Sequence, residues 1–243
     1  MDVRRREALR SLVAGTTAVL AAGIGAEKLM AQDKPAPARG KVLKYEAKPL
    51  PFDPAKLNGL SEKLLVSHHA NNYSGAVKNF NKTEDHLAAL AGDAPGFVLG
   101  GVKLHELTYT NSIILHEAYF DNLGGNGKYG EKFTSLISDA FGSVAAWEAQ
   151  FRATAMSLGG GSGWVILAYN AHTGVLRNYW SNHHTLAPAM GIPLIVLDMY
   201  EHAYHMDFGA AHAKYVDAFF LNLNTEVVEQ RLEAAAKMGA LLK

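Results

Sequence analysis

Four residues in separate parts of the chain have side chains that could together bind a metal ion: His68, His116, Asp198 and His202. Each has apolar neighbours, which predicts that these polar groups lie inside the fold. A buried carboxylate is costly unless it is paired or bound to metal. Taken singly the signals are weak, because a lone helical histidine is more often structural, and a carboxylate–imidazole pair is equally common without a metal.

The composition narrows the chemistry of such a site. The 243 residues include no cysteine and eleven histidines, so zinc–thiolate sites, iron–sulfur clusters, disulfides and thiol nucleophiles are excluded. Imidazole and carboxylate ligands suit zinc, iron, manganese or nickel. Basic and acidic residues number 23 each, so nothing in the charge points to nucleic acid as a partner.

Residues 1–31 have the layout of a signal peptide. Four arginines are followed by an apolar run, Leu12 to Ile24, which is shorter than the roughly 20 residues of a membrane-spanning helix. The run from Arg5 to Arg10 resembles a twin-arginine export signal, with Ala8 where an aromatic residue is usual. We therefore expect an exported, periplasmic protein that has no membrane contact after signal removal. Plain secretory export and an uncleaved anchor are the alternatives.

The next segments predict an extended arm and a helical hairpin. Five prolines in residues 32–54 are typical of an extended arm. Helical patterns run from Ser61 to about Asn81 and from about Val102 to Leu123, and glycines then break the chain. Residues 55–127 are expected to form an antiparallel helical hairpin domain.

Residues 128–243 predict an α/β C-terminal domain. Residues 130–158 read as helical, and so do residues 211–242. Between them lie three strand-like runs, residues 164–169, 175–180 and 193–197. The predicted fold class is therefore α+β, with an N-terminal antiparallel helical hairpin followed by a three-stranded antiparallel sheet flanked by helices.

Three short segments carry motifs: residues 141–143, Phe-Gly-Ser; residues 161–164, Gly-Ser-Gly-Trp; and residues 197–204, Leu-Asp-Met-Tyr-Glu-His-Ala-Tyr. Together they resemble the iron/manganese superoxide dismutase family. Residues 197–204, Leu-Asp-Met-Tyr-Glu-His-Ala-Tyr, are similar to its D-x-W-E-H-A-Y signature, with Tyr200 in place of tryptophan. Phe141-Gly142-Ser143 and Gly161-Ser162-Gly163-Trp164 match its F-G-S and G-S-G-W segments. The resemblance covers about residues 45–235.

This resemblance implies a function and a set of roles. His68, His116, Asp198 and His202 would hold one iron or manganese ion per subunit, and superoxide would be converted to dioxygen and hydrogen peroxide. Trp164 and Tyr200 would lie around the site. The resemblance also implies a homodimer in which Glu201 reaches the partner chain's fourth ligand.

Departures from the family pattern affect the surroundings of the site. Ala76 stands where the family has a gateway tyrosine, and Tyr73, one turn earlier, is the candidate to replace it as a proton relay. Asn72 and His205 replace a pair that meets across the family's dimer interface.

Another departure concerns the glutamine that the family places beside the metal site. Ser112 stands at its position in iron enzymes. His183 occupies its position in manganese enzymes and is the preferred candidate for this catalytic role here, with His184 as the competitor.

Two other functions are weighed: a metal-binding protein on this scaffold without dismutase activity, and a zinc hydrolase. A catalytic zinc site usually keeps three protein ligands, which argues against the hydrolase.

Overall fold

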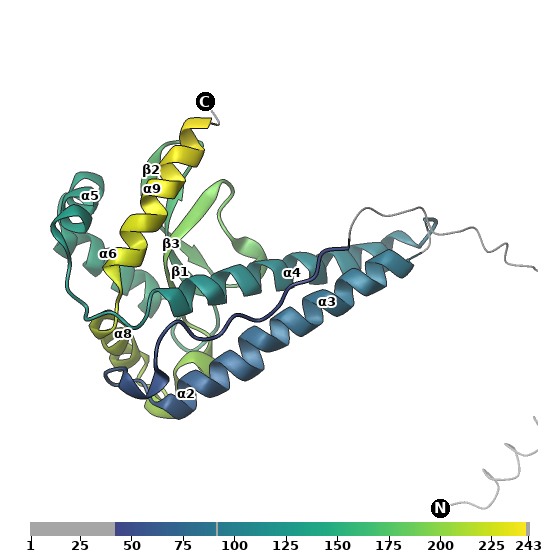
Figure 1. Cartoon of the computed structure of the whole chain (residues 1–243), viewed down its shortest axis with the longest axis horizontal. Coiled ribbons are helices and arrows are strands. Elements are labelled where there is room, and N and C mark those ends of the chain that lie inside the picture. Colours follow the sequence, from purple (N-terminus) through teal and green to yellow (C-terminus); the bar gives the residue numbers. More distant parts are fainter. Residues whose placement is uncertain (1–41, 91, 242–243) are drawn as a thin grey trace, which may run out of the picture. The chain divides into compact units, whose positions relative to one another are not determined.

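The computed structural model describes residues 42–90 and 92–241, which belong to one compact unit, residues 35–243 (Figure 1). The predicted signal peptide and the first ten residues of the predicted arm lie outside the described residues. No helix in the described ranges is both long and apolar enough to cross a membrane.

The first half of the unit is the expected helical hairpin. Ser61 caps the first helix by accepting a hydrogen bond from the Leu64 backbone N–H at 3.1 Å. The helix then runs through one π turn, in which the Ser74 N–H reaches the carbonyl of His69. After a short loop the chain returns alongside the first helix (Figure 1). The elements are η1 (Pro54–Lys56), α2 (Glu62–Ser67), the π segment η2 (His68–Tyr73), α3 (Ser74–Ala89) and α4 (Gly96–Asp121).

The arm before the hairpin has neither helix nor strand from residue 42 to residue 50. It is held along α3 by a reciprocal pair of hydrogen bonds, in which the backbone of Tyr45 and the side-chain amide of Asn81 each donate to the other at 2.9 Å. Such pairing replaces the strand partner that an isolated extended segment would lack.

The helices of the second half are more broken than the sequence indicates. Residues 130–158, predicted as one helical stretch, form α5 (Glu131–Phe141) and α6 (Val144–Met156). Gly142 adopts a positive φ of 84°, and Ser143 caps the second helix on the Ala146 N–H at 3.0 Å. The C-terminal stretch is likewise divided, into the short α7 (His205–Phe208), α8 (His212–Leu221) and α9 (Thr225–Leu241).

The sheet confirms the predicted fold class. Its strands are β1 (Trp164–Asn170), β2 (Val175–Ser181) and β3 (Gly191–Asp198), in the order β2-β1-β3 with both pairings antiparallel. β1 is the central strand, and helices flank the sheet (Figure 1). The register places Trp164 opposite both Ser181 and Asp198, so the start of β1 lies beside the end of β3.

One buried residue joins the hairpin to the sheet. Directly after α4, the Asn122 amide donates to the Leu194 carbonyl at 3.0 Å and accepts from the Val196 N–H at 2.8 Å. Both partners are on β3. This clamp fixes the last turns of α4, which carry His116, against the strand that ends in Asp198.

Candidate metal centre

The four predicted ligands meet inside the fold. One nitrogen or oxygen atom from each of His68, His116, Asp198 and His202 lies within 4.8 Å of all the others. The Asp198 Oδ2 atom is 3.1 Å from His68 Nε2, 3.6 Å from His116 Nε2 and 3.2 Å from His202 Nε2. Two ligand atoms that are each about 2.1 Å from the same metal ion lie roughly 3.0–3.6 Å from each other when the ligand–metal–ligand angle is about 90–120°. The spacing therefore fits a single metal ion.

Different elements deliver the four side chains. His68 begins the π segment, His116 lies in the last turns of α4, Asp198 ends β3, and His202 lies in the short helix η4 (Glu201–Ala203). π turns within helices are frequently found at functional sites.

Two further contacts hold Asp198 in place. Its Oδ1 atom accepts a hydrogen bond from the Tyr200 N–H at 2.8 Å, and its backbone carbonyl accepts from the Tyr215 hydroxyl at 2.7 Å. The contribution of Tyr215 has no signal in the sequence, because this residue lies in α8, 17 positions away.

The hydrogen bonding leaves the His116 ring ready to bind a metal. Its Nδ1 atom is 2.7 Å from the Ser112 carbonyl, which can only accept, so the proton resides on Nδ1. No described residue offers a hydrogen-bond partner to the buried Nε2 atom. A buried polar atom without a partner is costly, and this lone pair is aimed at the other three ligand atoms. Orientation by a second hydrogen bond of this kind is typical of metal-binding histidines.

The charge states also fit a metal site. Burial lowers the pKa of His116 to about 3, and burial lowers the pKa of His68 despite the nearby Asp198. Burial acts to raise the pKa of Asp198, but His202 and His68 hold that pKa below its ordinary value. His68 and His116 are therefore neutral and Asp198 is ionised at neutral pH, and metals bind these forms.

His184, not His183, lies beside the cluster. The Trp164 indole donates from Nε1 to His184 Nδ1 at 3.0 Å. The His184 ring stacks on Tyr200 at 4.8 Å between ring centres and lies 6.4 Å from the ring of His116. Tyr200 stacks in turn on His202 at 5.4 Å. The expected neighbours Trp164 and Tyr200 thus form a wall of the site.

The preference for His183 was wrong as to position. His183 is exposed, and its Nδ1 atom is bonded within its own turn to Thr185, 2.9 Å from the hydroxyl. His184 begins the short helix η3 (His184–Leu186), and its half-buried ring lies against Trp164 and Tyr200. Sequence alignment by motif could not resolve a shift of one residue in this loop.

Tyr73 does not replace the missing gateway tyrosine. Its hydroxyl donates to Glu117 at 2.9 Å and accepts from the Lys48 N–H at 2.9 Å, on the side of the hairpin that faces the arm. Ala76 is on the opposite side and borders the cavity that leads to the metal cluster. Tyr73 ends the π segment, whereas Ala76 lies in the first turn of α3.

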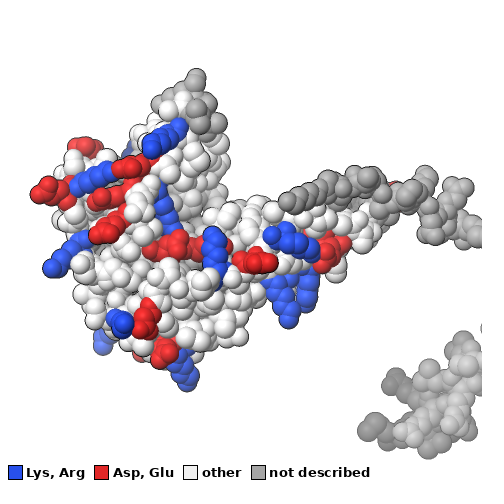
Figure 2. All heavy atoms as spheres, in the orientation of Figure 1, with Lys and Arg blue, Asp and Glu red and all other residues white. Residues whose placement is uncertain are grey.

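That cavity has a volume of about 230 Å³. It opens onto three of the histidines near the site, His116, His184 and His202. The rest of its lining is uncharged: Asn71, Asn72, Gly75, Ala76, Asn79, Thr108, Tyr109 and Ser112. On the face seen in Figure 2, acidic and basic side chains are interspersed rather than separated into fields of one sign. Because the cavity lining contains no Lys, Arg, Asp or Glu, attraction of an anion has to come from the site itself.

Of the three residues expected at a dimer interface, two are on the surface. Glu201 and His205 are both exposed, and they flank His202 and Tyr204 in the chain. Asn72, expected on the same side, is half-buried and borders the cavity. The described chain by itself thus leaves this side of the site uncovered.

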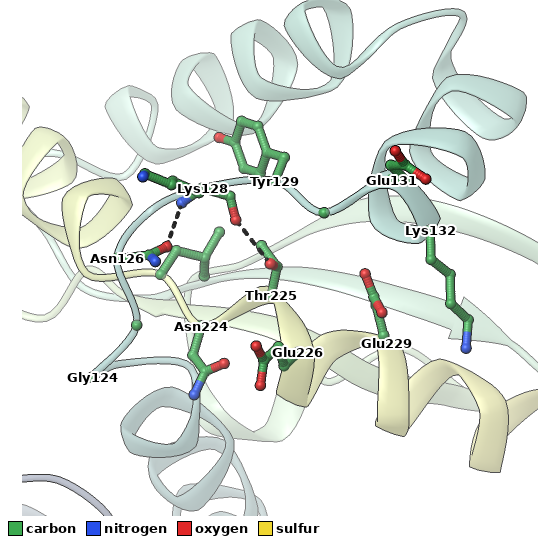
Figure 3. Close-up of a pocket in the computed structure, with 13 residues that line it drawn as sticks. Gly124, Asn126, Lys128, Tyr129, Glu131, Lys132, Asn224, Thr225, Glu226 and Glu229 are labelled. Carbon is green, nitrogen blue, oxygen red and sulfur yellow. Dashed lines mark hydrogen bonds between the residues drawn. The ribbon is translucent and has the colours of Figure 1, made fainter.

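A larger cavity, of about 780 Å³, lies elsewhere, between the loop after α4 and the start of α9 (Figure 3). Its acidic residues already serve the fold. Glu229 accepts a hydrogen bond from the Phe133 N–H at 2.9 Å, and Glu131 and Glu226 lie in the first turns of α5 and α9. Carboxylates at helix starts are stabilising without any ligand.

Comparison with known proteins agrees with this site. Residues 129–231 match the model of iron/manganese superoxide dismutases, C-terminal domain. The chain is 50% identical over 194 residues to superoxide dismutase (Fe) of Cupriavidus metallidurans, covering 79% of this chain and 98% of that protein. It is 33% identical over 199 residues to superoxide dismutase (Mn) 1 of Halobacterium salinarum, covering 79% and 97%.

A third relative, superoxide dismutase (Fe) of Aquifex pyrophilus, is 32% identical over 199 residues, covering 78% of this chain and 92% of that protein. The matched lengths span nearly all of each relative. The chain, with its cluster of three histidines and one aspartate, belongs to the iron/manganese superoxide dismutase family.

Proposed function

We propose that this protein is a superoxide dismutase that converts two superoxide anions, with two protons, to dioxygen and hydrogen peroxide. The observation that carries the proposal is the convergence of four ligand atoms within 4.8 Å at the inner end of an uncharged cavity. A bound iron or manganese ion would supply the one-electron couple that both halves of this reaction need.

The surrounding residues have definite tasks in this reaction. Asp198 contributes the one negative charge of the cluster, so the occupied site keeps a net positive charge that attracts an anion. The indole N–H of Trp164 can only donate, so Nδ1 of His184 accepts and the ring proton resides on Nε2. Burial lowers the pKa of His184 to about 4, so the ring is neutral. His184 can thus offer an N–H to an anion in the cavity.

The test is to purify the protein, count iron and manganese per chain, and assay superoxide loss on the same sample. Loss that rises in proportion to bound metal supports the proposal. A full complement of metal without superoxide loss would instead support the second candidate, a metal-binding protein on this scaffold. The specific observation that favours this candidate is the absence of a phenol at position 76.

We propose that either iron or manganese serves. Three imidazoles and one carboxylate suit both ions, and the relatives named above include proteins of each type. Reconstitution of metal-free protein with each ion, followed by the same assay, tests this choice. A single active metal would narrow the proposal to that ion.

We also propose a homodimer built on the exposed side that carries Glu201 and His205. The support is that His202 is partly exposed there, whereas the other three ligands are buried. A two-fold axis would let Glu201 reach the partner's site while the partner does the same in return. Glu201→Ala should lower both the dimer fraction in sedimentation and the activity. A fully active monomer would exclude this interface.

Export through the twin-arginine route is a further proposal, supported by Arg5, Arg6 and the apolar run after them. Replacing both arginines with lysine should retain the protein in the cytoplasm. Unchanged periplasmic recovery of that variant would favour plain secretory export.

A further inference from the structure

The arm before the hairpin is bonded to both helices of the hairpin, on the side opposite the cavity that leads to the metal cluster (Figure 1). The residues that make these bonds are Lys48 of the arm, His69 and Tyr73 of the π segment, and Glu117 of α4. We call these four residues the arm clasp. They border a cavity of only about 20 Å³, so the clasp is closely packed.

Tyr73 is the centre of the arm clasp. Its side chain is buried, and burial raises the pKa of its hydroxyl to about 12, so the hydroxyl keeps its proton at neutral pH. The hydroxyl donates a hydrogen bond to Oε1 of Glu117 at 2.9 Å and accepts one from the Lys48 N–H at 2.9 Å. A buried phenol needs such partners, whereas a phenylalanine would fill the same space without them. The two bonds therefore indicate a directional role for the hydroxyl.

Lys48 brings the arm into the clasp through its backbone as well as its side chain. Its carbonyl lies 2.7 Å from His69 Nε2, and because a carbonyl can only accept, this nitrogen carries the proton. Its ammonium group forms an ion pair with the second carboxylate oxygen of Glu117. The lysine side chain is 70% exposed, so the ion pair contributes little by itself. The two backbone bonds are thus the main link between the arm and the hairpin at this level.

The bond between Tyr73 and Glu117 links the two helices of the hairpin. Among the described residues, it is the one hydrogen bond that joins the first helix, from α2 to α3, directly to α4. Apolar packing between helices is non-directional, whereas a hydrogen bond requires a defined distance and angle. This bond therefore sets how the two helices are placed relative to each other beside the metal cluster.

The arm clasp is coupled to two of the metal ligands. His69 and Glu117 directly follow ligands in the chain, so a shift of either residue moves the ligand before it. The ring of Phe120 packs against the same two ligands, with its centre 5.1 Å from the ring centre of His68 and 6.3 Å from that of His116. A displacement at the clasp would therefore reach both imidazoles.

A second anchor shows that the arm does not need the clasp merely in order to dock. Farther along α3, the backbone of Tyr45 and the amide of Asn81 exchange two hydrogen bonds, and Lys44 pairs with Asp85. These contacts involve no residue of α4 and no residue next to a ligand. They hold the arm to α3 alone, whereas the clasp bridges the two helices that carry ligands.

We propose that Tyr73 is a positioning residue for the metal centre. Through the arm clasp it keeps His68 and His116 at a fixed separation, so that the ion is released only when the hairpin opens locally. Such opening becomes more frequent when a bond that opposes it is removed. This role concerns retention of the ion and not turnover by the occupied site. It rests on the metal centre alone, and it holds for a dismutase and for a metal-binding protein alike.

The rate at which a chelator removes manganese from the loaded protein tests this role. Tyr73→Phe keeps the ring and removes both bonds of the hydroxyl, so release should be at least about fivefold faster, the factor for one net hydrogen bond. Asn81→Ala is the control, because it removes two bonds of the arm without touching the clasp. It should lower the melting temperature at least as much and leave the release rate unchanged. Equal release from all three proteins, or equally fast release from both variants, would overturn the proposal.

Two changes at Glu117 separate the bond to Tyr73 from the ion pair. Glu117→Gln keeps an oxygen that can accept from the hydroxyl and loses the charge, so release should stay within about twofold of the unaltered rate. Glu117→Ala removes the acceptor and should release the ion at least about fivefold faster. Because the two residues share one bond, the double variant with Tyr73→Phe should release more slowly than the product of the single effects predicts. A double variant equal to that product would show that they act independently, and would overturn the proposal.

Cobalt(II) provides a readout of ligand geometry that does not depend on release. Its visible absorption depends on the arrangement of its ligands, so Tyr73→Phe should change the bands of the cobalt-loaded protein and Asn81→Ala should not. Identical bands in the unaltered protein and both variants would overturn the positioning role while leaving the metal centre intact. Failure of the unaltered protein to take up cobalt or manganese would contradict the metal centre itself, and this role with it.

Discussion

The indole Nε1 atom of Trp164 and the imidazole Nδ1 atom of His184 lie 3.0 Å apart and form one hydrogen bond. Trp164 opens the central strand, and His184 begins a short helix after the edge strand β2. Because an indole can only donate, this bond selects the tautomer of His184 and leaves its other nitrogen protonated. It also distinguishes His184 from its neighbour His183, whose ring is in solvent.

Exchanging His184 should alter how well each metal supports activity. We predict that His184→Gln changes the ratio of iron-supported to manganese-supported activity several-fold while both metals still bind. An amide has a different reach and does not share the fixed tautomer of the imidazole. His183→Gln is the matched control and should leave the ratio unchanged. If His183→Gln changed the ratio and His184→Gln did not, on separately reconstituted samples, His183 and not His184 would be the residue beside the metal.

Removing the indole donor should weaken this arrangement without emptying the site. We predict that Trp164→Phe lowers the rate of superoxide loss by about fivefold, which corresponds to the roughly 1 kcal/mol of one net hydrogen bond. Metal content should stay at the unaltered level. Equal loss of metal and activity would show that Trp164 supports the ligands rather than His184.

Tyr73 should matter for stability and not for turnover. Its hydroxyl joins Glu117 to the arm, so Tyr73→Phe should cost about 1 kcal/mol in the free energy of unfolding and leave activity within about twofold. Ala76→Tyr, which places a phenol in the cavity wall, should lower the rate several-fold by filling that space. Denaturant unfolding and the superoxide assay on both variants check this. A large activity loss in Tyr73→Phe would contradict its placement.

The metal-free protein should lose stability in acid. Burial lowers the pKa of His116 to about 3 and that of His184 to about 4, against an ordinary value near 6.5. Between these values the unfolded chain binds protons that the folded chain does not, so stability rises with pH across this window and falls as the pH drops.

The lowered pKa of Asp198 also makes stability fall as the pH drops, in the pH range below the ordinary Asp pKa of 3.8. Melting temperatures of metal-free protein from pH 4 to 8 should show this slope, and His116→Gln should flatten it. His105→Gln, at an exposed position on the same helix, is the control. A metal-free protein that is more stable at pH 5 than at pH 7 would contradict these charge states.

Much of the fold could be predicted from local patterns. The apolar runs bounded by glycine and turn residues locate all three strands, and Ser61 marks the start of the first helix. The break between α5 and α6 was not predicted, because a helical pattern tolerates one glycine. Only the left-handed backbone conformation of Gly142 shows that α5 ends there. The π turn at His68 was missed for a similar reason, since its sequence is also compatible with an α-helix.

The four ligands could be predicted, but their surroundings could not. The ligand motifs depend on residues that are close in sequence, such as Asp198 and His202. Whether His184 and Tyr73 face the cluster depends on how a loop and a helix are rotated by about one residue. The types of the side chains do not indicate this rotation. Tyr215 reaches Asp198 only through tertiary packing.

The most direct test of the central claim compares metal content with superoxide loss in a single preparation of the unaltered protein and of His116→Ala. We predict about one iron or manganese ion per chain in the unaltered protein, with a rate proportional to the metal bound. His116→Ala should be folded by circular dichroism, retain almost no metal and show no activity. Stoichiometric metal in His116→Ala, or superoxide loss by metal-free protein, would contradict the assignment of this cluster as the catalytic metal centre.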